Sequence, residues 1–155
     1  MIKRLAIVGV CAMLATACGG GSEAPPAEKA AAPEPAPAPV PRVFFVSPQE
    51  GAMVKSPVMF QFGIENFTIA AVPEGTVTET RPMTGHHHLG IEQDCLPPGT
   101  EIPKGQPSWV HFGMGNNTID MQLTPGTHKL VVQAGDDRHA TMTGLCETIT
   151  VNVTE

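Results

Sequence analysis

Apolar and polar residues alternate along almost every segment of the second part of this chain, and prolines and glycines separate the alternating segments. Val58, Phe60, Phe62 and Ile64, for example, occupy every second position of one segment. This spacing places apolar side chains on one face of a β-strand, and no segment keeps a helical period for more than two turns. The chain is therefore predicted to be all-β, with an immunoglobulin-like antiparallel β-sandwich of seven to eight strands over residues 42–155.

Four of the expected strands define which loops share an end of the sandwich. We assign residues 58–64, 86–92, 127–134 and 146–153 to the B, C, F and G positions of such a fold, which places the B–C and F–G loops at the same end. The Cys-Trp-Cys arrangement and the tyrosine corner of antibody domains are absent from the sequence, so the prediction concerns architecture only. The remaining strands are expected near residues 43–46, 67–72, 108–112 and 119–123.

The first 17 residues have the order of a secretory signal: a short basic start, an apolar run and small residues before Cys18. The segment Leu14-Ala15-Thr16-Ala17-Cys18 resembles the lipobox of bacterial lipoproteins, which implies cleavage before Cys18 and its acylation. Ordinary cleavage after Ala17 is the alternative. Because residue 19 is Gly rather than Asp, we expect a lipid-anchored envelope protein at the outer membrane, facing the periplasm.

Residues 18–41 are rich in Ala, Pro and Glu and are predicted to be an extended linker. Removal of residues 1–17 takes away Lys3 and Arg4 and no acid, which leaves seven basic and fifteen acidic residues and a net charge of −8. A surface of this charge repels phosphate backbones, so we expect no nucleic-acid partner. The expected partners are the membrane, through the lipid, and an envelope protein.

Three consecutive histidines begin one of the predicted strands. In the segment Thr84–Glu92, Leu89 and Ile91 share one face with His87, while His86 and His88 share the other. If the leucine and isoleucine point to the core, His86 and His88 project outward together, with Cα atoms about 6.5–7 Å apart. That spacing suits two ligands of one metal ion.

The predicted topology brings further ligands to the same edge. Asp136 and His139 lie in the F–G loop, and His111 joins them if its strand neighbours the histidine strand. Imidazoles and a carboxylate at one edge suit Zn²⁺ or Cu²⁺, and Met114 or Met142 could serve Cu⁺. The alternative is that surface histidines bond only to water or backbone carbonyls. His87 and His128 fall on apolar faces and are expected to be buried and structural.

Two cysteines remain in the predicted domain once Cys11 is removed with the signal and Cys18 is acylated. In an oxidising compartment Cys95 and Cys146 are expected to form a disulfide. This prediction conflicts with the strand assignment, which puts the two residues near opposite ends of a strand about 23 Å long. Either the loop after Glu92 folds back, or the strand assignment is wrong, or the thiols are free.

Four motifs in order resemble the bacterial domain-of-unknown-function family 4399: Gly85-His86-His87-His88-Leu89, His111-Phe112-Gly113-x-Gly115, Leu123-x-Pro125-Gly126-x-His128-x-Leu130, and Gly135-Asp136 with His139. The resemblance spans residues 43–153 and implies an exported bacterial protein. The resemblance also implies that these histidines and Asp136 are positions of the family's sequence motifs. The chain departs from the family pattern after His139, where a second histidine and prolines are replaced by Ala140-Thr141-Met142-Thr143-Gly144.

The sequence thus predicts a binding domain with a histidine-rich edge as a copper or zinc site. The alternative is a structural or protein-interaction domain whose histidines bind no metal. No catalytic residues are predicted, because the chain has no Gly-x-Ser-x-Gly motif and Cys146 lacks the nearby His and Met of a blue-copper loop.

Overall fold

The computed structural model describes residues 38–155, and the predictions for the signal segment, Cys18 and most of the linker lie outside these residues. These residues form one compact unit. The segment before the first strand is attached to it, because the Asn66 side chain donates a hydrogen bond to the carbonyl of Val40 at 3.0 Å.

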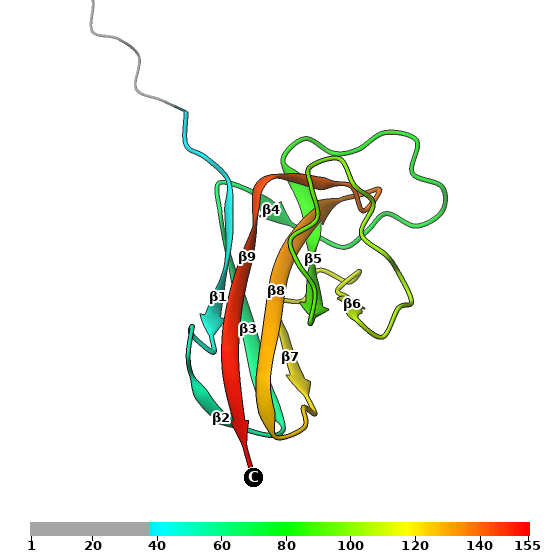
Figure 1. Ribbon diagram of the computed structural model, residues 1–155. Helices are drawn as coiled ribbons and strands as arrows, with labels where there is room; N and C mark the ends of the chain where they lie inside the picture. The colour runs from blue at the N-terminus through cyan, green and yellow to red at the C-terminus, as the bar shows by residue number, and fades with distance from the viewer. Residues whose placement is uncertain (1–37) are drawn as a thin grey trace, which may run out of the picture. The chain divides into compact units, whose positions relative to one another are not determined.

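Two β-sheets form the domain (Figure 1). The smaller sheet has three antiparallel strands in the order β1 (Arg42–Ser47), β3 (Val58–Glu65) and β7 (Thr118–Met121). The larger sheet has six strands, which run in the order β2 (Met53–Lys55), β9 (Thr141–Thr154), β8 (Gly126–Asp136), β5 (Thr84–Ile91) and β4 (Thr68–Ile69), with β6 (Trp109–His111) also paired to β5. Strand β5 is therefore covered on one edge by β8 and on the other by β4 and β6.

The main core lies between the two sheets. Alternate residues of β3, including Phe60 and Phe62, face the larger sheet, which contributes Leu89, Leu130 and Val132. All five side chains are 0–1% exposed. Each buried side chain of this size stabilises the fold by about 1.5–3 kcal/mol, so the interface between the sheets supplies most of the hydrophobic driving force.

The all-β prediction is confirmed, and residues 38–155 contain no helix, so this part of the chain has no helix that could span a membrane. Each of the eight predicted segments contains a strand, but β2 was not predicted. It has three residues, too few to show alternation, and it pairs in parallel with the end of β9. Strand β4 is also parallel to its neighbour β5, so the larger sheet is mixed rather than antiparallel.

The prediction of a long loop over residues 135–144 is wrong. Strands β8 and β9 continue to Asp136 and from Thr141, and a tight turn joins them. The amide of Asp136 donates to the carbonyl of Ala140, and the amide of His139 donates to the carbonyl of Asp136. Glycines and polar residues on both sides of the turn hide the alternation that identifies a strand.

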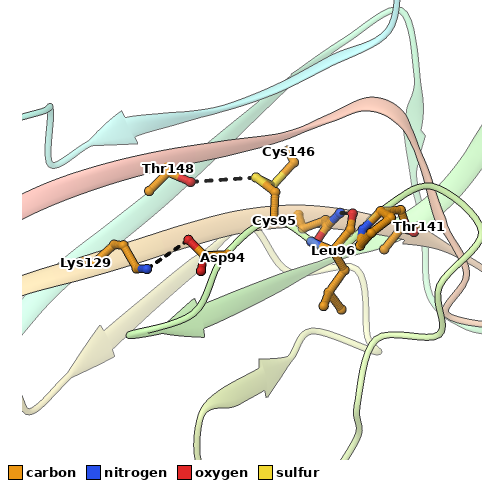
Figure 2. Close-up of a disulfide and its surroundings, with 9 residues drawn as sticks. Asp94, Cys95, Leu96, Lys129, Thr141, Cys146 and Thr148 are labelled. Carbon is orange, nitrogen blue, oxygen red and sulfur yellow. Dashed lines mark hydrogen bonds and ion pairs between the residues drawn. A yellow bond between two sulfur atoms is a disulfide. The ribbon is translucent and has the colours of Figure 1, made fainter.

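This extension resolves the conflict over the cysteines. Cys146 pairs with Gln133 in the middle of the sheet, not at an end, because β9 begins five residues earlier than predicted. The loop after β5 also folds back across the sheet. Cys95 and Cys146 form a disulfide with Cα atoms 6.0 Å apart, within the range such a bond requires (Figure 2).

Candidate metal centre

His86 and His88 lie on the face of β5 that points away from the main core. Their ring centroids are 4.6 Å apart, as expected for alternate residues of one strand. Both side chains are 0% exposed, so the expectation that this face is open to solvent is wrong. A second, smaller hydrophobic cluster, formed by Ile102, Trp109 and Val131, lies on the same face, because Trp109 and Val131 are the register partners of Gly90.

His111 reaches the same place through strand pairing. Strand β6 is antiparallel to β5, and His111 lies directly opposite His88, with ring centroids 5.2 Å apart. The backbone of Gly113 lies close against this imidazole, because a Cβ at residue 113 would be 2.5 Å from Cε1 of His111. A side chain at that position would displace the ring. Unlike the β5 histidines, His111 is exposed to solvent.

His139 comes from the turn between β8 and β9. Its backbone has φ of 68°, in the left-handed region that non-glycine residues seldom adopt, and its ring centroid is 4.7 Å from that of His86. Gly85 permits the close approach of this turn, since a Cβ there would lie 2.0 Å from the carbonyl oxygen of Gly135. The Nε2 atoms of His139 and His111 are 3.0 Å apart.

Together these four histidines form a compact group, which we call the histidine cluster: His86, His88, His111 and His139. One ring nitrogen from each residue can be chosen so that all four atoms lie within 4.8 Å of one another. Tetrahedral coordination with Zn–N bonds of about 2.0–2.1 Å requires N···N separations of roughly 3.3–3.4 Å. The His111–His139 pair is already near that value, and modest side-chain rotations would bring in the other two.

The imidazoles of His86 and His88 have no hydrogen-bonding partner among the described residues. Both ring nitrogens of His86 and both of His88 are fully buried and unpaired. Burial and, to a smaller extent, the neighbouring imidazoles lower the pKa of His86 to about 3 and that of His88 to about 2. Burial also lowers the pKa of His111 and of His139. The four rings are therefore neutral at pH 7, the form that binds metals.

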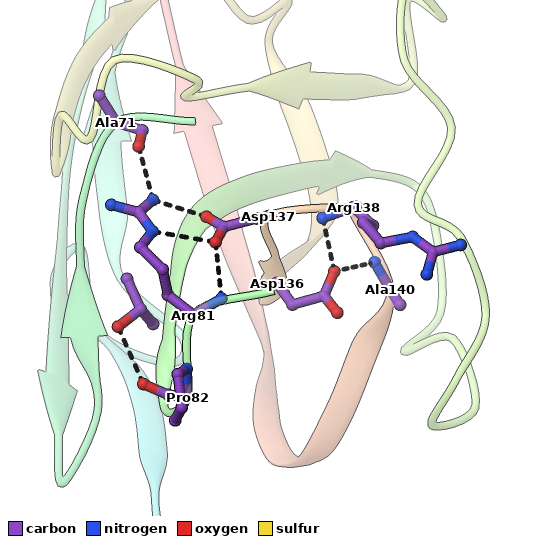
Figure 3. Close-up of polar contacts among 8 residues, drawn as sticks. Ala71, Arg81, Pro82, Asp136, Asp137, Arg138 and Ala140 are labelled. Carbon is purple, nitrogen blue, oxygen red and sulfur yellow. Dashed lines mark hydrogen bonds and ion pairs between the residues drawn. The ribbon is translucent and has the colours of Figure 1, made fainter. Parts of the chain in front are cut away.

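Asp136 does not belong to the cluster, so its prediction as a ligand is not matched by the geometry. Its Oδ1 accepts hydrogen bonds from the amides of Arg138 at 2.8 Å and Ala140 at 2.9 Å (Figure 3). The carboxylate closes the turn that carries His139 and acts on the site only through the backbone.

Asp137, which the same F–G loop carries, also lies outside the histidine cluster. Its side chain is 0% exposed and pairs with Arg81, whose Nε and NH2 groups donate to its two oxygens at 2.9 and 2.6 Å (Figure 3). These hydrogen bonds from Arg81 hold the pKa of Asp137 below its usual value. The pair ties the loop before β5 to the turn bearing His139. Its partners are 56 residues apart, a separation for which the sequence carries no signal.

The other two histidines lie outside the cluster. His87 is 1% exposed, packs against Phe62 with ring centroids 5.4 Å apart, and has Nδ1 3.4 Å from the carbonyl oxygen of Asn116. His128 is half-buried rather than buried, with its ring nitrogens 3.0 Å from Glu92 Oε1 and 2.8 Å from the carbonyl oxygen of Thr124. Both have protein neighbours of the kind expected for structural histidines.

Neither methionine proposed for Cu⁺ is part of the cluster. Met142 packs against the main core. Met114 is 82% exposed and lines a surface hollow of about 280 Å³ that His111 also lines. The nitrogen ligands alone define the buried site.

The fold and the cluster define a class: an all-β domain of two sheets with four imidazoles gathered on the outer face of the larger one. The sequence pattern of a family described as a domain of unknown function (DUF4399) matches residues 60–154, and the chain belongs to this family. The matched region contains all four histidines of the cluster and both cysteines of the disulfide. No curated protein and no solved structure matches the chain.

Proposed function

We propose that this domain binds one transition-metal ion, Zn²⁺ or Cu²⁺, through the histidine cluster. The observation that carries the proposal is the burial of four ring nitrogens of His86 and His88 with no partner among residues 38–155. A buried polar group without a hydrogen bond costs about 1–3 kcal/mol. A metal ion coordinated by one nitrogen of each ring would offset that cost and use the neutral imidazoles that burial maintains.

The ligand set favours borderline metals. Imidazole suits zinc, copper, iron and nickel, whereas magnesium and calcium require oxygen ligands, and Cu⁺ prefers sulfur. Four protein ligands fill a tetrahedral shell and leave no position for water or substrate, as in structural zinc sites. The function is therefore metal holding or handling rather than metal catalysis.

The proposed setting is the bacterial cell envelope. Acylation of Cys18 would anchor the protein in the outer membrane, and the Ala- and Pro-rich linker would space an immunoglobulin-like domain from it. Support for the anchor comes from the lipobox-like segment. Support for the fold type comes from the strand order, because β3 lies in one sheet while β5, β8 and β9 are consecutive in the other. Mass analysis of the mature N-terminus would detect the acyl chains, and a Cys18→Ser variant recovered from membranes in wild-type amount would contradict anchoring.

Metal binding is tested by native mass spectrometry and titration calorimetry of the purified full chain with Zn²⁺ and Cu²⁺. We expect one ion per chain, lost in the His86→Ala/His88→Ala variant. His128→Ala is the matched control, since His128 lies outside the cluster and should bind metal as the wild type does. The proposal would be ruled out if the wild type bound the metal ion no more tightly than free histidine in solution does. Equal binding by the double variant would also rule it out.

A non-catalytic interaction or structural domain is the second candidate. The observation that favours it is the 3.0 Å separation of His111 Nε2 and His139 Nε2, which also fits one imidazole donating a hydrogen bond to the other. In that case the double variant would leave metal content unchanged, and crosslinking in cells would recover an envelope protein.

A further inference from the structure

The loop between β5 and β6, residues 92–108, lies over the histidine cluster, and we call it the cover loop. The register of the larger sheet places four side chains in one row across its outer face: His111, His88, Gln133 and Cys146. The cover loop is attached to two of these four residues. His88 lies between His111 and Gln133 in this row.

The first part of the cover loop is attached through a covalent bond and two hydrogen bonds (Figure 2). Cys95 is bonded to Cys146. The amide of the next residue, Leu96, donates to Gln133 Oε1 at 3.0 Å, and its carbonyl accepts from Gln133 Nε2 at 2.9 Å. Gln133 is 1% exposed and is the register partner of His88 on β8, so this part of the loop is attached next to that histidine.

The second part of the cover loop is attached beside His139. The amide of Ile102 donates to the carbonyl of His139 at 2.9 Å, and the amide of Thr100 donates to Thr141 Oγ1 at 3.0 Å. Ile102 is 0% exposed and packs with Trp109 and Val131. Both attachments join the cover loop to β8, β9 and the turn between them, on one side of β5, whereas β6, where the loop ends, pairs with the other side of β5. The loop therefore passes from one edge of β5 to the other across the face that carries His86 and His88.

The disulfide is open to attack from solvent. Cys95 is exposed and Cys146 is half-buried, and the bond is at the surface of the cover loop. Exposed disulfides are the ones that reductants reach first. After the bond breaks, the first part of the cover loop is held by the two hydrogen bonds of Leu96 to Gln133, which contribute little against the entropy of the freed residues. The second part stays attached, because Gly99 and Thr100 remain hydrogen-bonded to Thr141.

We propose that the Cys95–Cys146 disulfide controls access to the histidine cluster, and that its reduction by a dithiol opens the cover loop over His88 and speeds metal exchange. This inference rests on the proposed metal-binding function. A thiolate of the dithiol attacks Cys95 Sγ, the S–S bond breaks and Cys146 leaves as the thiolate. The second thiol then resolves the mixed disulfide, so the protein gains two electrons and two protons while the dithiol becomes a disulfide.

The first test needs no metal. The full chain and its Cys95→Ser/Cys146→Ser variant are treated with diethylpyrocarbonate at pH 7, and modified histidines are mapped by mass spectrometry. We expect His88 modification to be at least tenfold faster in the variant, while His87, on the core face, stays protected in both proteins. Asp94→Ala is the matched control, because it removes only the exposed Asp94–Lys129 ion pair near the start of the loop.

Two results of this test would overturn the proposal. Equal protection of His88 in the variant and the wild type would show that the disulfide does not hold the cover loop closed. Faster modification of His87 together with His88 would show that the bond supports the whole domain rather than the loop.

The second test measures release of Zn²⁺ from the loaded full chain to a chromophoric chelator in excess. We expect release at least tenfold faster from the serine variant, with Asp94→Ala like the wild type. Equal release rates, with one ion bound to each protein, would show that the disulfide does not control access to the histidine cluster. That result would not contradict the proposed metal site. Absence of bound ion in the oxidised wild type would instead overturn the proposed function.

Discussion

Histidines on the two faces of β5 have different surroundings. On the core face, His87 packs against Phe62, and its Nδ1 lies 3.4 Å from the backbone oxygen of Asn116. On the outer face, His86 and His88 are equally buried, and their rings lie against other imidazoles. Burial therefore does not separate the structural histidine from the candidate ligands; the identity of the neighbours does.

The largest expected difference between the faces is in the pH dependence of stability. Burial lowers the pKa values of His86 and His88 to about 3 and about 2, against 6.5 in the unfolded chain. The unfolded state binds their protons first as the pH falls, so stability is lost from pH 6.5 downward. Between pH 6.5 and 5 the two protonations together should cost the metal-free protein about 3 kcal/mol.

Urea unfolding of the metal-free wild type and of His86→Leu/His88→Leu at the two pH values measures this effect. The variant should lose about 3 kcal/mol less than the wild type over that interval. His87, whose pKa burial lowers to about 4, remains in both proteins and contributes equally. Identical losses would mean that the outer-face rings are solvated.

Truncation of a side chain on the core face should lower the stability of the domain without changing its metal binding. His87→Ala removes a ring packed against Phe62 and should lower the free energy of unfolding by about 3 kcal/mol. Chemical denaturation and native mass spectrometry, done in parallel, should show a less stable protein that still takes up one ion. Loss of the ion would place His87 in the site and remove the distinction between the faces.

An apolar substitution on the outer face should raise the free energy of unfolding of the metal-free protein instead of lowering it. His88→Leu replaces a ring with two unpaired buried nitrogens by a side chain of similar size, so the metal-free protein should gain about 1–2 kcal/mol. Thermal unfolding with a chelator present measures the gain. With saturating Zn²⁺ the order should reverse, because only the wild type keeps all four ligands. A variant less stable than the metal-free wild type would show that His88 has a favourable partner.

The smallest effect is expected at the turn beyond the outer face. Asp136→Ala removes a carboxylate that accepts two backbone hydrogen bonds and should lower stability by about 1 kcal/mol. Calorimetry should find its Zn²⁺ affinity within about threefold of the wild type, a change of about 0.7 kcal/mol. A larger loss would restore Asp136 as a ligand.

Alternation alone was enough to predict the two faces of β5 and the all-β class. The assignment of the F and G positions also led to His139, although the loop expected to carry it is a tight turn. Both predictions depend on local periodicity and on the rule that neighbouring loops share an end of a sandwich.

The burial of the outer face could not be predicted in the same way. It depends on Ile102 and Leu96, which lie in a segment rich in Pro and Gly without any period, and on contacts with Gln133 that cross 37 residues of chain. Asp137 and Arg81 pair over a longer separation still. Such contacts arise from tertiary packing, which leaves no trace in local patterns.

Strand β6 contributes three residues to the sheet, yet its pairing of His111 with His88 has a topological consequence. An ion held by the cluster would link β5, β6 and the turn before β9. It would close a loop of chain from His86 to His139, and most of that loop also lies within the 51-residue separation of the disulfide cysteines. Two cross-links of one interval restrict the unfolded chain only slightly more than one does. With the ion bound, breaking the sulfur bridge would therefore change the freedom of the cover loop far more than it changes the overall stability of the fold.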